Sequence, residues 1–152
     1  SIPSEMKLLS QLELIDLSYN SFVGFIPSEI GLLKKNLDEL YLNDNKLEGL
    51  IPSELGQLSK LSTLFLDSNI LTGFIPTEIG HLGELTRLNL ELNQLSGSIP
   101  TEIGLLEKVN ELRLTDNLKL TGTIPDTICE AKCIVVEGTD VKKPNDCGQS
   151  CI

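Results

Sequence analysis

The sequence is poor in aromatic residues, in basic residues and in long apolar segments. Phe, Tyr and Trp make up 4% of the 152 residues, Trp is absent and Met occurs once, so a core built from the 40% apolar residues must be aliphatic. The chain has 12 basic and 22 acidic residues, which gives a net charge of −10. This balance argues against nucleic acids and anionic membrane surfaces as partners, because both are bound largely through Lys and Arg. No apolar run approaches the roughly 18 residues of a membrane-spanning helix.

Residues suited to catalysis are equally scarce. The chain has one histidine, His81, and no Ser or Asp stands at a spacing that would complete a catalytic triad with it. The sequence holds no nucleophile elbow, phosphate-binding loop or zinc-protease helix. We therefore expect no enzymatic activity and no cofactor, and we expect His81 to be a solvated surface residue.

What the sequence does have is a repeat of 24 or 25 residues. The Ile-Pro pair recurs at Ile2-Pro3, Ile26-Pro27, Ile51-Pro52, Ile75-Pro76, Ile99-Pro100 and Ile124-Pro125. An asparagine recurs in step with it, at Asn20, Asn45, Asn69, Asn93 and Asn117. A glycine does the same, at Gly24, Gly49, Gly73, Gly97 and Gly122. Columns that stay in register over five units indicate a repeat protein, in which each unit buries its apolar face by stacking on its neighbours.

Each unit reads as a strand, a turn and a short helical segment. Residues 61–66, L-S-T-L-F-L, end in the alternation of a strand with one buried face. Asn69 follows, and its amide can satisfy backbone groups that the turn leaves unpaired, so the asparagine column predicts a structural ladder. Gly73 permits a backbone shape that a Cβ would resist. Pro76 then starts a helical turn, with Glu78 close to its positive N-terminal end.

The unit pattern L-x-x-L-x-L-x-x-N-x-L-x-G-x-I-P resembles the plant-type leucine-rich repeat of receptor-like proteins and receptor kinase ectodomains, over about residues 1–128. The resemblance implies an α/β repeat fold: a right-handed solenoid with a parallel β-sheet on its concave side and short helical or 3-10 turns on its convex side. The carboxylates that follow the Ile-Pro pairs are expected to act on helix starts and not as a calcium row. They are Glu5, Glu29, Glu54, Glu78 and Glu102.

The two ends of the chain differ. Ser1-Ile2-Pro3 is already in register with the repeats, so we expect that an N-terminal cap is missing and that five units fill residues 1–128. Cys129, Cys133, Cys147 and Cys151 follow, and residues 129–152 are expected to form a disulfide-bonded C-terminal cap, with zinc binding as the alternative. This tail resembles the Cys-rich end of diatom leucine-rich repeat proteins.

Three disulfide connectivities are possible for four cysteines, and the sequence does not choose between them. We favour Cys129 with Cys147 and Cys133 with Cys151, which would fold the tail over the last repeat. Such disulfides imply an extracellular or cell-surface location.

The candidate ligand-binding residues stand between the core leucines of the strands, where side chains should point outward on the concave sheet. They are Tyr19, Tyr41, Phe65, Asp67, Arg87, Glu91 and Arg113. Tyr41 and Phe65 share a column on adjacent units, so their rings should lie about one strand spacing apart. Aromatic and Arg side chains on a rigid sheet are typical of a binding hot spot, but a solvated sheet also tolerates Tyr and Phe. Asn89, in the same column, is expected to be exposed.

A second surface column lies between the glycine and the isoleucine of each unit. It is apolar at Phe25, Leu50 and Phe74, and polar at Ser98 and Thr123. Exposed apolar stripes often mark contact sites, and ordinary strand packing along the lateral face is the alternative. We treat Phe25, Leu50 and Phe74 as a secondary patch.

These observations favour an extracellular module that recognises a protein or peptide. Carboxylates outnumber bases in the outward columns, so the expected partner is basic. The resemblance implies a receptor-like protein, with any kinase outside this chain. One alternative is a secreted enzyme inhibitor similar to polygalacturonase-inhibiting proteins. The other is a structural or ice-binding surface protein, although the concave columns do not repeat as an ice lattice would require.

Overall fold

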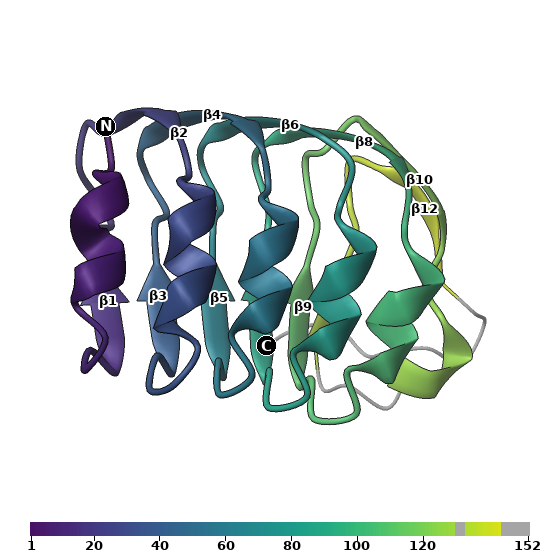
Figure 1. Ribbon diagram of the computed structural model, residues 1–152. Helices are drawn as coiled ribbons and strands as arrows, with labels where there is room; N and C mark the ends of the chain where they lie inside the picture. The colour runs from purple at the N-terminus through teal and green to yellow at the C-terminus, as the bar shows by residue number, and fades with distance from the viewer. Residues whose placement is uncertain (130–132, 144–152) are drawn as a thin grey trace.

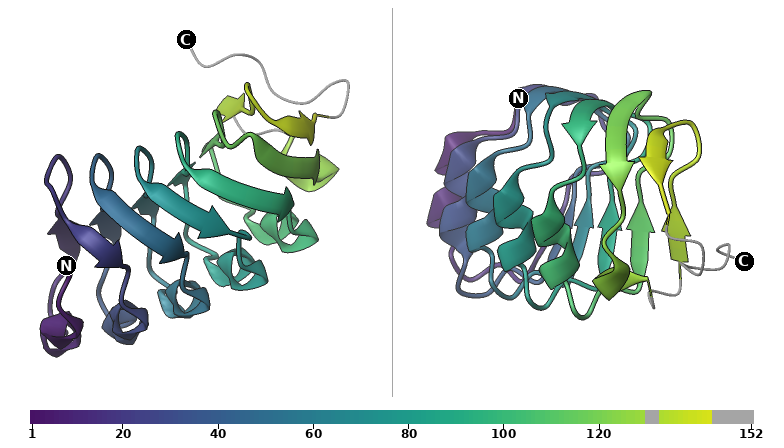
Figure 2. Two further views of the ribbon diagram at one scale, coloured as in Figure 1. Left: turned by 90° about the horizontal axis from the view of Figure 1, so that it is seen from above. Right: turned by 90° about the vertical axis from the view of Figure 1, so that its right-hand side faces the viewer.

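The computed structural model describes residues 1–129 and 133–143, which form one curved solenoid (Figure 1). Its first sheet is six-stranded and parallel, with the strands in chain order. The strands are β1 (Leu14–Asp16), β3 (Glu39–Tyr41), β5 (Thr63–Phe65), β7 (Arg87–Asn89), β9 (Glu111–Arg113) and β11 (Cys133–Val135). Figure 2 shows this sheet on the inner, concave side of the stack. The solenoid predicted from the repeat is thereby confirmed.

A second parallel sheet runs along the edge of the stack, and the sequence analysis did not predict it. Its six strands also follow one another in chain order. They are β2 (Val23–Phe25), β4 (Lys46–Leu50), β6 (Ile70–Gly73), β8 (Gln94–Ser98), β10 (Lys119–Thr123) and β12 (Asp140–Lys142). The column expected on a lateral face is therefore part of a sheet, or lies directly after its strands. Each rung of the solenoid thus contributes one strand to each sheet.

Short 3-10 turns form the convex layer (Figure 2). They are η1 (Ser4–Leu8), η2 (Ser28–Leu33), η3 (Ser53–Gln57), η4 (Thr77–His81), η5 (Thr101–Leu105) and η6 (Asp126–Ile128). Each follows a proline with extended backbone, as at Pro76 with φ −67° and ψ 141°. His81 ends η4 and is exposed. Within the described part of the chain, no helix is long and apolar enough to cross a membrane.

Glycines let the convex turns approach one another closely. A Cβ placed on Gly56 in η3 would collide with the carbonyl oxygen of Glu78 in the next turn. Gly31 and Gly80 stand in the same relation to Glu54 and Glu102. Because the atom in the way is backbone, it cannot move aside without shifting a whole rung.

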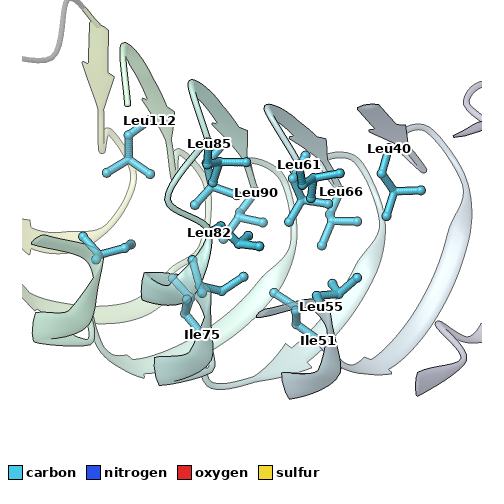
Figure 3. Packing of buried hydrophobic residues seen from close by; sticks show 14 of the residues in the cluster. Leu40, Ile51, Leu55, Leu61, Leu66, Ile75, Leu82, Leu85, Leu90 and Leu112 are labelled. Atoms are coloured by element: carbon cyan, nitrogen blue, oxygen red, sulfur yellow. The ribbon is translucent and has the colours of Figure 1, made fainter. Parts of the chain in front are cut away.

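The core between the layers is a stack of aliphatic side chains (Figure 3). Leu64 and Leu66 from the first sheet region, Leu71 from the second sheet, and Leu55 and Leu58 from the convex side of the rung are all 0% exposed. Each unit thus contributes side chains from all three sides. At about 25 cal/mol for each Å² of apolar surface buried, this repeated burial is the main force that holds the rungs together.

The asparagine column forms a ladder of hydrogen bonds between rungs. Asn69 Nδ2 donates to the carbonyl oxygens of Leu42, Leu66 and Asp67 at 3.0–3.2 Å, and its Oδ1 accepts the N–H of Leu47 at 2.9 Å. Asn45 repeats the pattern on the rung before, and Asn93 and Asn117 repeat it on the two rungs after. Asn20, on the first rung, is exposed, and its side-chain amide donates to the carbonyl oxygens of Leu17 and Ser18 in its own rung. Each inner asparagine thus joins its own rung to the rung before it.

The residue before each asparagine has a left-handed backbone. The φ angles are 53° at Tyr19, 53° at Asp44, 54° at Ser68, 51° at Leu92 and 56° at Asp116. None of these residues is glycine, and a non-glycine residue in this region costs roughly 1–2 kcal/mol. The buried hydrogen bonds of the following asparagine offset this cost. The sequence analysis did not predict this conformation.

The expected C-terminal cap begins as a sixth rung. β11 pairs with β9 and β12 pairs with β10 in the same parallel arrangement as the earlier strands. Gly138, with φ 66°, takes the left-handed position, and Thr139 Oγ1 replaces the asparagine by donating to the Val136 carbonyl. Neither Cys129 nor Cys133 is a free thiol. Cys147 and Cys151 lie outside the described residues, so the disulfide pairing stays a prediction.

Candidate functional site

Three side chains of the concave sheet form an aromatic and cationic cluster. Tyr41 stands directly opposite Phe65 in the pairing of β3 with β5. Their ring centroids are 5.3 Å apart and their planes meet at 84°, an edge-to-face contact. The Arg87 guanidinium lies over the Phe65 ring, with Cζ 5.4 Å from its centroid. The cluster therefore spans three rungs, which is the adjacency expected from the columns.

Arg87 is held in place by hydrogen bonds as well as by the ring. Its Nη2 donates to the Tyr41 hydroxyl at 3.2 Å and to Thr63 Oγ1 at 3.0 Å, and its Nε donates to Thr63 Oγ1 at 3.2 Å. The Tyr41 hydroxyl in turn donates to the Glu39 carboxylate. Burial raises the pKa of Tyr41 above its usual value, and Glu39 adds to this effect while Arg87 opposes it. The cluster is thus preorganised before any partner arrives.

An open hollow of about 420 Å³ lies beside the cluster, over the ends of the concave strands. Its lining includes five of the seven predicted residues: Tyr19, Tyr41, Phe65, Asp67 and Arg113. It also includes four residues that were not among the predicted ones: Ser18, Asn43, Asn89 and Glu111. All four stand in the outward columns, and their positions between the core leucines were the signal that could have identified them. Pockets of this size are typical of ligand sites.

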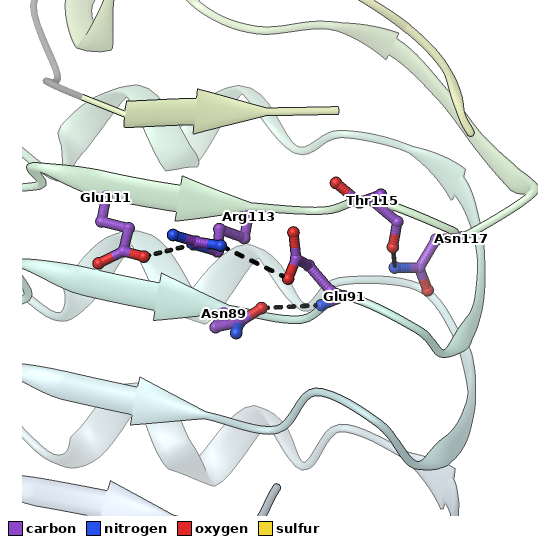
Figure 4. Close-up of polar contacts among 6 residues, drawn as sticks. All are labelled: Asn89, Glu91, Glu111, Arg113, Thr115 and Asn117. Atoms are coloured by element: carbon purple, nitrogen blue, oxygen red, sulfur yellow. Dashed lines mark hydrogen bonds and ion pairs between the residues drawn. The ribbon is translucent and has the colours of Figure 1, made fainter. Parts of the chain in front are cut away.

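The far side of the hollow is a network of charges (Figure 4). Arg113 Nε pairs with the Glu111 carboxylate, and Arg113 Nη1 lies 3.9 Å from Glu91 Oε2. Asn89 Oδ1 accepts the backbone N–H of Glu91 at 3.1 Å. Arg113 therefore compensates part of the negative charge there and is not available as a free cation.

The expectation that Asn89 is exposed was wrong. Asn89 is only 8% exposed, and Thr63 and Asn43, also in outward columns, are 1% and 6% exposed. Thr63 is hydrogen-bonded by Arg87. The reason is that a position pointing out of a concave sheet can be covered by long side chains of the next rung, which the column pattern alone does not reveal.

Asp67 has the most unusual electrostatics of the hollow. Its pKa is raised to about 6, mainly by burial and also by the nearby carboxylates of Asp44 and Glu91, although hydrogen bonds from its own backbone N–H and from Ser68 act in the opposite direction. Asp67 Oδ1, Asn43 Oδ1 and Thr115 Oγ1 are buried and have no hydrogen-bond partner among the described residues. The hydrogen bonds that the Asp67 carboxyl does receive are too few to offset the effect of its burial on the charged form.

The secondary patch lies on the second sheet, on a different face. Phe25, Leu50 and Phe74 are 67%, 63% and 68% exposed. Each leans over the glycine of the following rung, where a Cβ would strike the Phe25, Leu50 or Phe74 side chain. The stripe ends at Ser98, whose small side chain makes only ordinary contact with Gly122.

The described residues contain no group of three or more His, Cys, Asp or Glu side chains that could hold a metal ion. The convex carboxylates of Glu29, Glu54, Glu78 and Glu102 lie at the starts of their 3-10 turns. Glu54, Glu78 and Glu102 each have a hydrogen bond from the neighbouring Ser or Thr hydroxyl.

Comparison with solved structures finds plant proteins of the same architecture. A TDR receptor superposes with a TM-score of 0.88 at 38% identity, over 92% of this chain and 24% of that one. The Arabidopsis receptor kinase HAESA, in complex with the peptide hormone IDA and the co-receptor SERK1, gives 0.76 at 30% identity, over 93% and 28%. A plant ice-binding protein gives 0.81 at 28% identity, over 92% and 53%. The chain spans about a quarter of the length of the two receptor chains.

A search of curated proteins finds no significant match to this chain. Models of protein families, in contrast, agree with the structural matches. Leucine-rich repeat family models match residues 11–33 and 35–95, which together make up more than half of the chain. The chain therefore belongs to the leucine-rich repeat proteins of the plant type.

Proposed function

We propose that this chain is an extracellular recognition module that binds a peptide or protein on its concave sheet. The observation that carries the proposal is the preorganised cluster of Tyr41, Phe65 and Arg87 beside an open hollow. Aromatic and Arg side chains with fixed rotamers supply most of the binding energy at protein interfaces, since little entropy is lost when they are engaged.

The similarity to receptor ectodomains supports the same proposal. HAESA, which matches over most of this chain, binds the peptide hormone IDA and the co-receptor SERK1. A comparable role for this chain places it outside the cell as the recognition segment of a receptor-like protein. Recognition needs no chemistry by the chain itself, and any kinase lies outside it.

The acidic surface favours a basic partner. The chain carries a net charge of −10, and Asp67, Glu91 and Glu111 lie in or beside the hollow. Carboxylates around a binding site speed the approach of a cationic partner, and this effect weakens as salt is added.

The C-terminal residues complete the proposal. We propose that residues 129–152, which include the sixth rung, form a disulfide-bonded cap on the repeats of residues 1–128, with Cys129 paired to Cys147 and Cys133 to Cys151. Non-reducing mass spectrometry tests this pairing, and four free thiols or stoichiometric zinc would contradict it.

The match to a plant ice-binding protein makes an ice-binding surface the second candidate. An ice lattice requires a flat array of repeated Thr or Asn side chains. The outward column of the second sheet region instead changes from Phe25, Leu50 and Phe74 to Ser98 and Thr123. We therefore favour recognition of a peptide or protein over this candidate.

The test is a selection of binders from a random library of linear peptides, followed by calorimetry on the intact chain and two variants. Phe65→Ala removes an anchor of the cluster and should weaken binding by at least about 1 kcal/mol. Phe74→Ala is the matched control, because it removes an equally large ring from the second sheet face. If only the Phe74 change weakens binding, the secondary patch is the site and the concave assignment is wrong.

A further inference from the structure

Three hydrogen-bond acceptors of the concave face are buried and receive no hydrogen bond from any residue that the structure describes. They are Asn43 Oδ1, Asp67 Oδ1 and Thr115 Oγ1. All three belong to the same outward column, two residues after the strand, on different rungs of the stack. A buried acceptor without a donor costs roughly 1–3 kcal/mol. A ligand that donates hydrogen bonds to this column would therefore be favoured.

Two of these three acceptors belong to a pair of neighbouring residues, Asn43 and Asp67. The two stand on neighbouring rungs, and both line the hollow beside Tyr41 and Phe65. Asn43 is 94% buried, and its amide nitrogen is already engaged as a donor to Asp44 Oδ2 at 2.8 Å. Its carbonyl oxygen is thus fixed as the free end of the side chain. The other side of the sheet is filled with leucines, and the oxygen itself is closed to solvent, so a donor reaches it from the hollow as the side chains that cover it move aside.

The charge around this pair specifies which donor fits. Asp67 is surrounded by the carboxylates of Asp44 and Glu91, which act on it electrostatically. Arg113 is engaged by Glu111 and Glu91, and Arg87 by Thr63, Tyr41 and the Phe65 ring. A neutral donor would satisfy the acceptors but leave this negative charge uncompensated. A cation satisfies both.

From this geometry we infer that Asn43 and Asp67 form a subsite for one basic side chain of the bound peptide, a lysine ammonium or an arginine guanidinium, next to the aromatic cluster. The ammonium or guanidinium N–H groups donate to Asn43 Oδ1 and to the Asp67 carboxylate, and the alkyl part of the side chain lies against Tyr41 and Phe65. This inference rests on the proposed function and names the group that the concave site selects.

The test uses the peptides selected from the random library and synthesised individually. Those whose binding requires Phe65 should contain a lysine or arginine, and replacing it with norleucine should weaken binding to the intact chain at least about tenfold. Asp67→Asn keeps the shape of the side chain and should cause the same loss. The norleucine peptide should lose nothing further on this variant, because the two changes remove one interaction. Lysine and arginine versions of each peptide then show which cation is preferred.

Asp38→Asn is the matched control, because it removes one exposed carboxylate at the opposite end of the β3 strand, outside the hollow. A loss of similar size on this variant would mean that net charge, and not the subsite, attracts the peptide, and would overturn the inference. Peptides that require Phe65 but tolerate both norleucine and Asp67→Asn would also overturn it, while leaving the proposed function intact. If no selected peptide depends on Phe65, the proposed function fails and the subsite fails with it.

Discussion

The guanidinium of Arg87 lies over the ring of Phe65, although the two residues stand in different columns of the sheet. Arg87 is opposite Thr63, and it reaches diagonally to the ring and on to the hydroxyl of Tyr41 two rungs away. This contact makes the concave surface a connected unit and not a set of independent side chains.

Phe65 and Arg87 should therefore contribute to stability in a coupled way. In a double-mutant cycle of Phe65→Ala and Arg87→Ala, we expect a coupling energy of about 0.5–1 kcal/mol, the size of a partly exposed cation–π contact. Urea denaturation of the four proteins measures it. The cycle of Phe74→Ala with Arg87→Ala, whose side chains belong to different faces, should give a value near zero. Equal coupling in both cycles would contradict the contact.

Asn69 should be worth far more to stability than an exposed asparagine. Asn69→Ala removes a side chain that makes three donor contacts and accepts one N–H in the core, so the free energy of unfolding should fall by roughly 1–3 kcal/mol. Asn110→Ala, at an exposed position, should change it by less than about 0.5 kcal/mol. Asn89→Ala should fall between them, because Asn89 is buried but accepts only the Glu91 N–H. Thermal denaturation ranks the three variants, and equal effects would refute the ladder.

Asp67→Asn should stabilise the fold near neutral pH. The folded pKa of about 6 lies above the ordinary aspartate value of 3.8, so the folded state binds the proton more tightly than the unfolded state does. Wild-type stability is therefore lost as pH rises from about 4 through 6, as the Asp67 carboxyl ionises near Asp44 and Glu91. Because Asp67 is partly exposed, solvent screening reduces the effect to the order of 1 kcal/mol, or about 2–4 °C in Tm.

The advantage of Asp67→Asn should appear above pH 6 and vanish near pH 4. Melting curves of both proteins across this range measure the difference in Tm. The contributions of the other carboxylates to the pH dependence cancel in that difference. The ¹³C shift of the Asp67 carboxyl gives an independent midpoint. A midpoint near the ordinary aspartate value, with equal Tm values at pH 7.5, would contradict this prediction.

Gly56→Ala should destabilise the solenoid, whereas Gly83→Ala should not. A Cβ on Gly56 would collide with the backbone of the next 3-10 turn, so we expect a loss of roughly 1–3 kcal/mol from overpacking. A Cβ on Gly83 would meet no atom within 4 Å, so removing that glycine should be neutral or stabilise by up to about 1 kcal/mol. Comparable losses in both variants, measured by urea denaturation, would show that the close approach of the turns is not what requires glycine.

The sequence predicted those features that recur in every unit. The concave strands, the asparagine ladder and the placement of Tyr41 beside Phe65 follow from side chains that alternate or repeat at fixed spacing. The second sheet was missed because its strands run through the glycine column and carry residues as different as Phe25 and Ser98 at the same position. The sixth rung was missed because Gly138 and Thr139 replace the residues that mark the pattern.

The details of the site were harder to predict for a different reason. Burial of Thr63 depends on the direction that Arg87 takes across the sheet, and a long side chain has many rotamers from which the pattern does not choose. The exposure of Asn89 was also predicted wrongly, because its place in an outward column does not show that it is only 8% exposed. Column position shows which side chains share a face, but not which of them cover the others.

The left-handed residue of each rung has a consequence for the reach of the recognition surface. In an ordinary strand, successive side chains face opposite sides, so only every second residue can meet a partner. The reversed φ of Tyr19 breaks this alternation directly after Ser18, and both residues line the same hollow. The first rung therefore gains an outward side chain that strict alternation would turn away from the hollow. The same backbone position holds Asp44, Ser68, Leu92 and Asp116 on the later rungs, so its residue type can change from rung to rung without lengthening the chain.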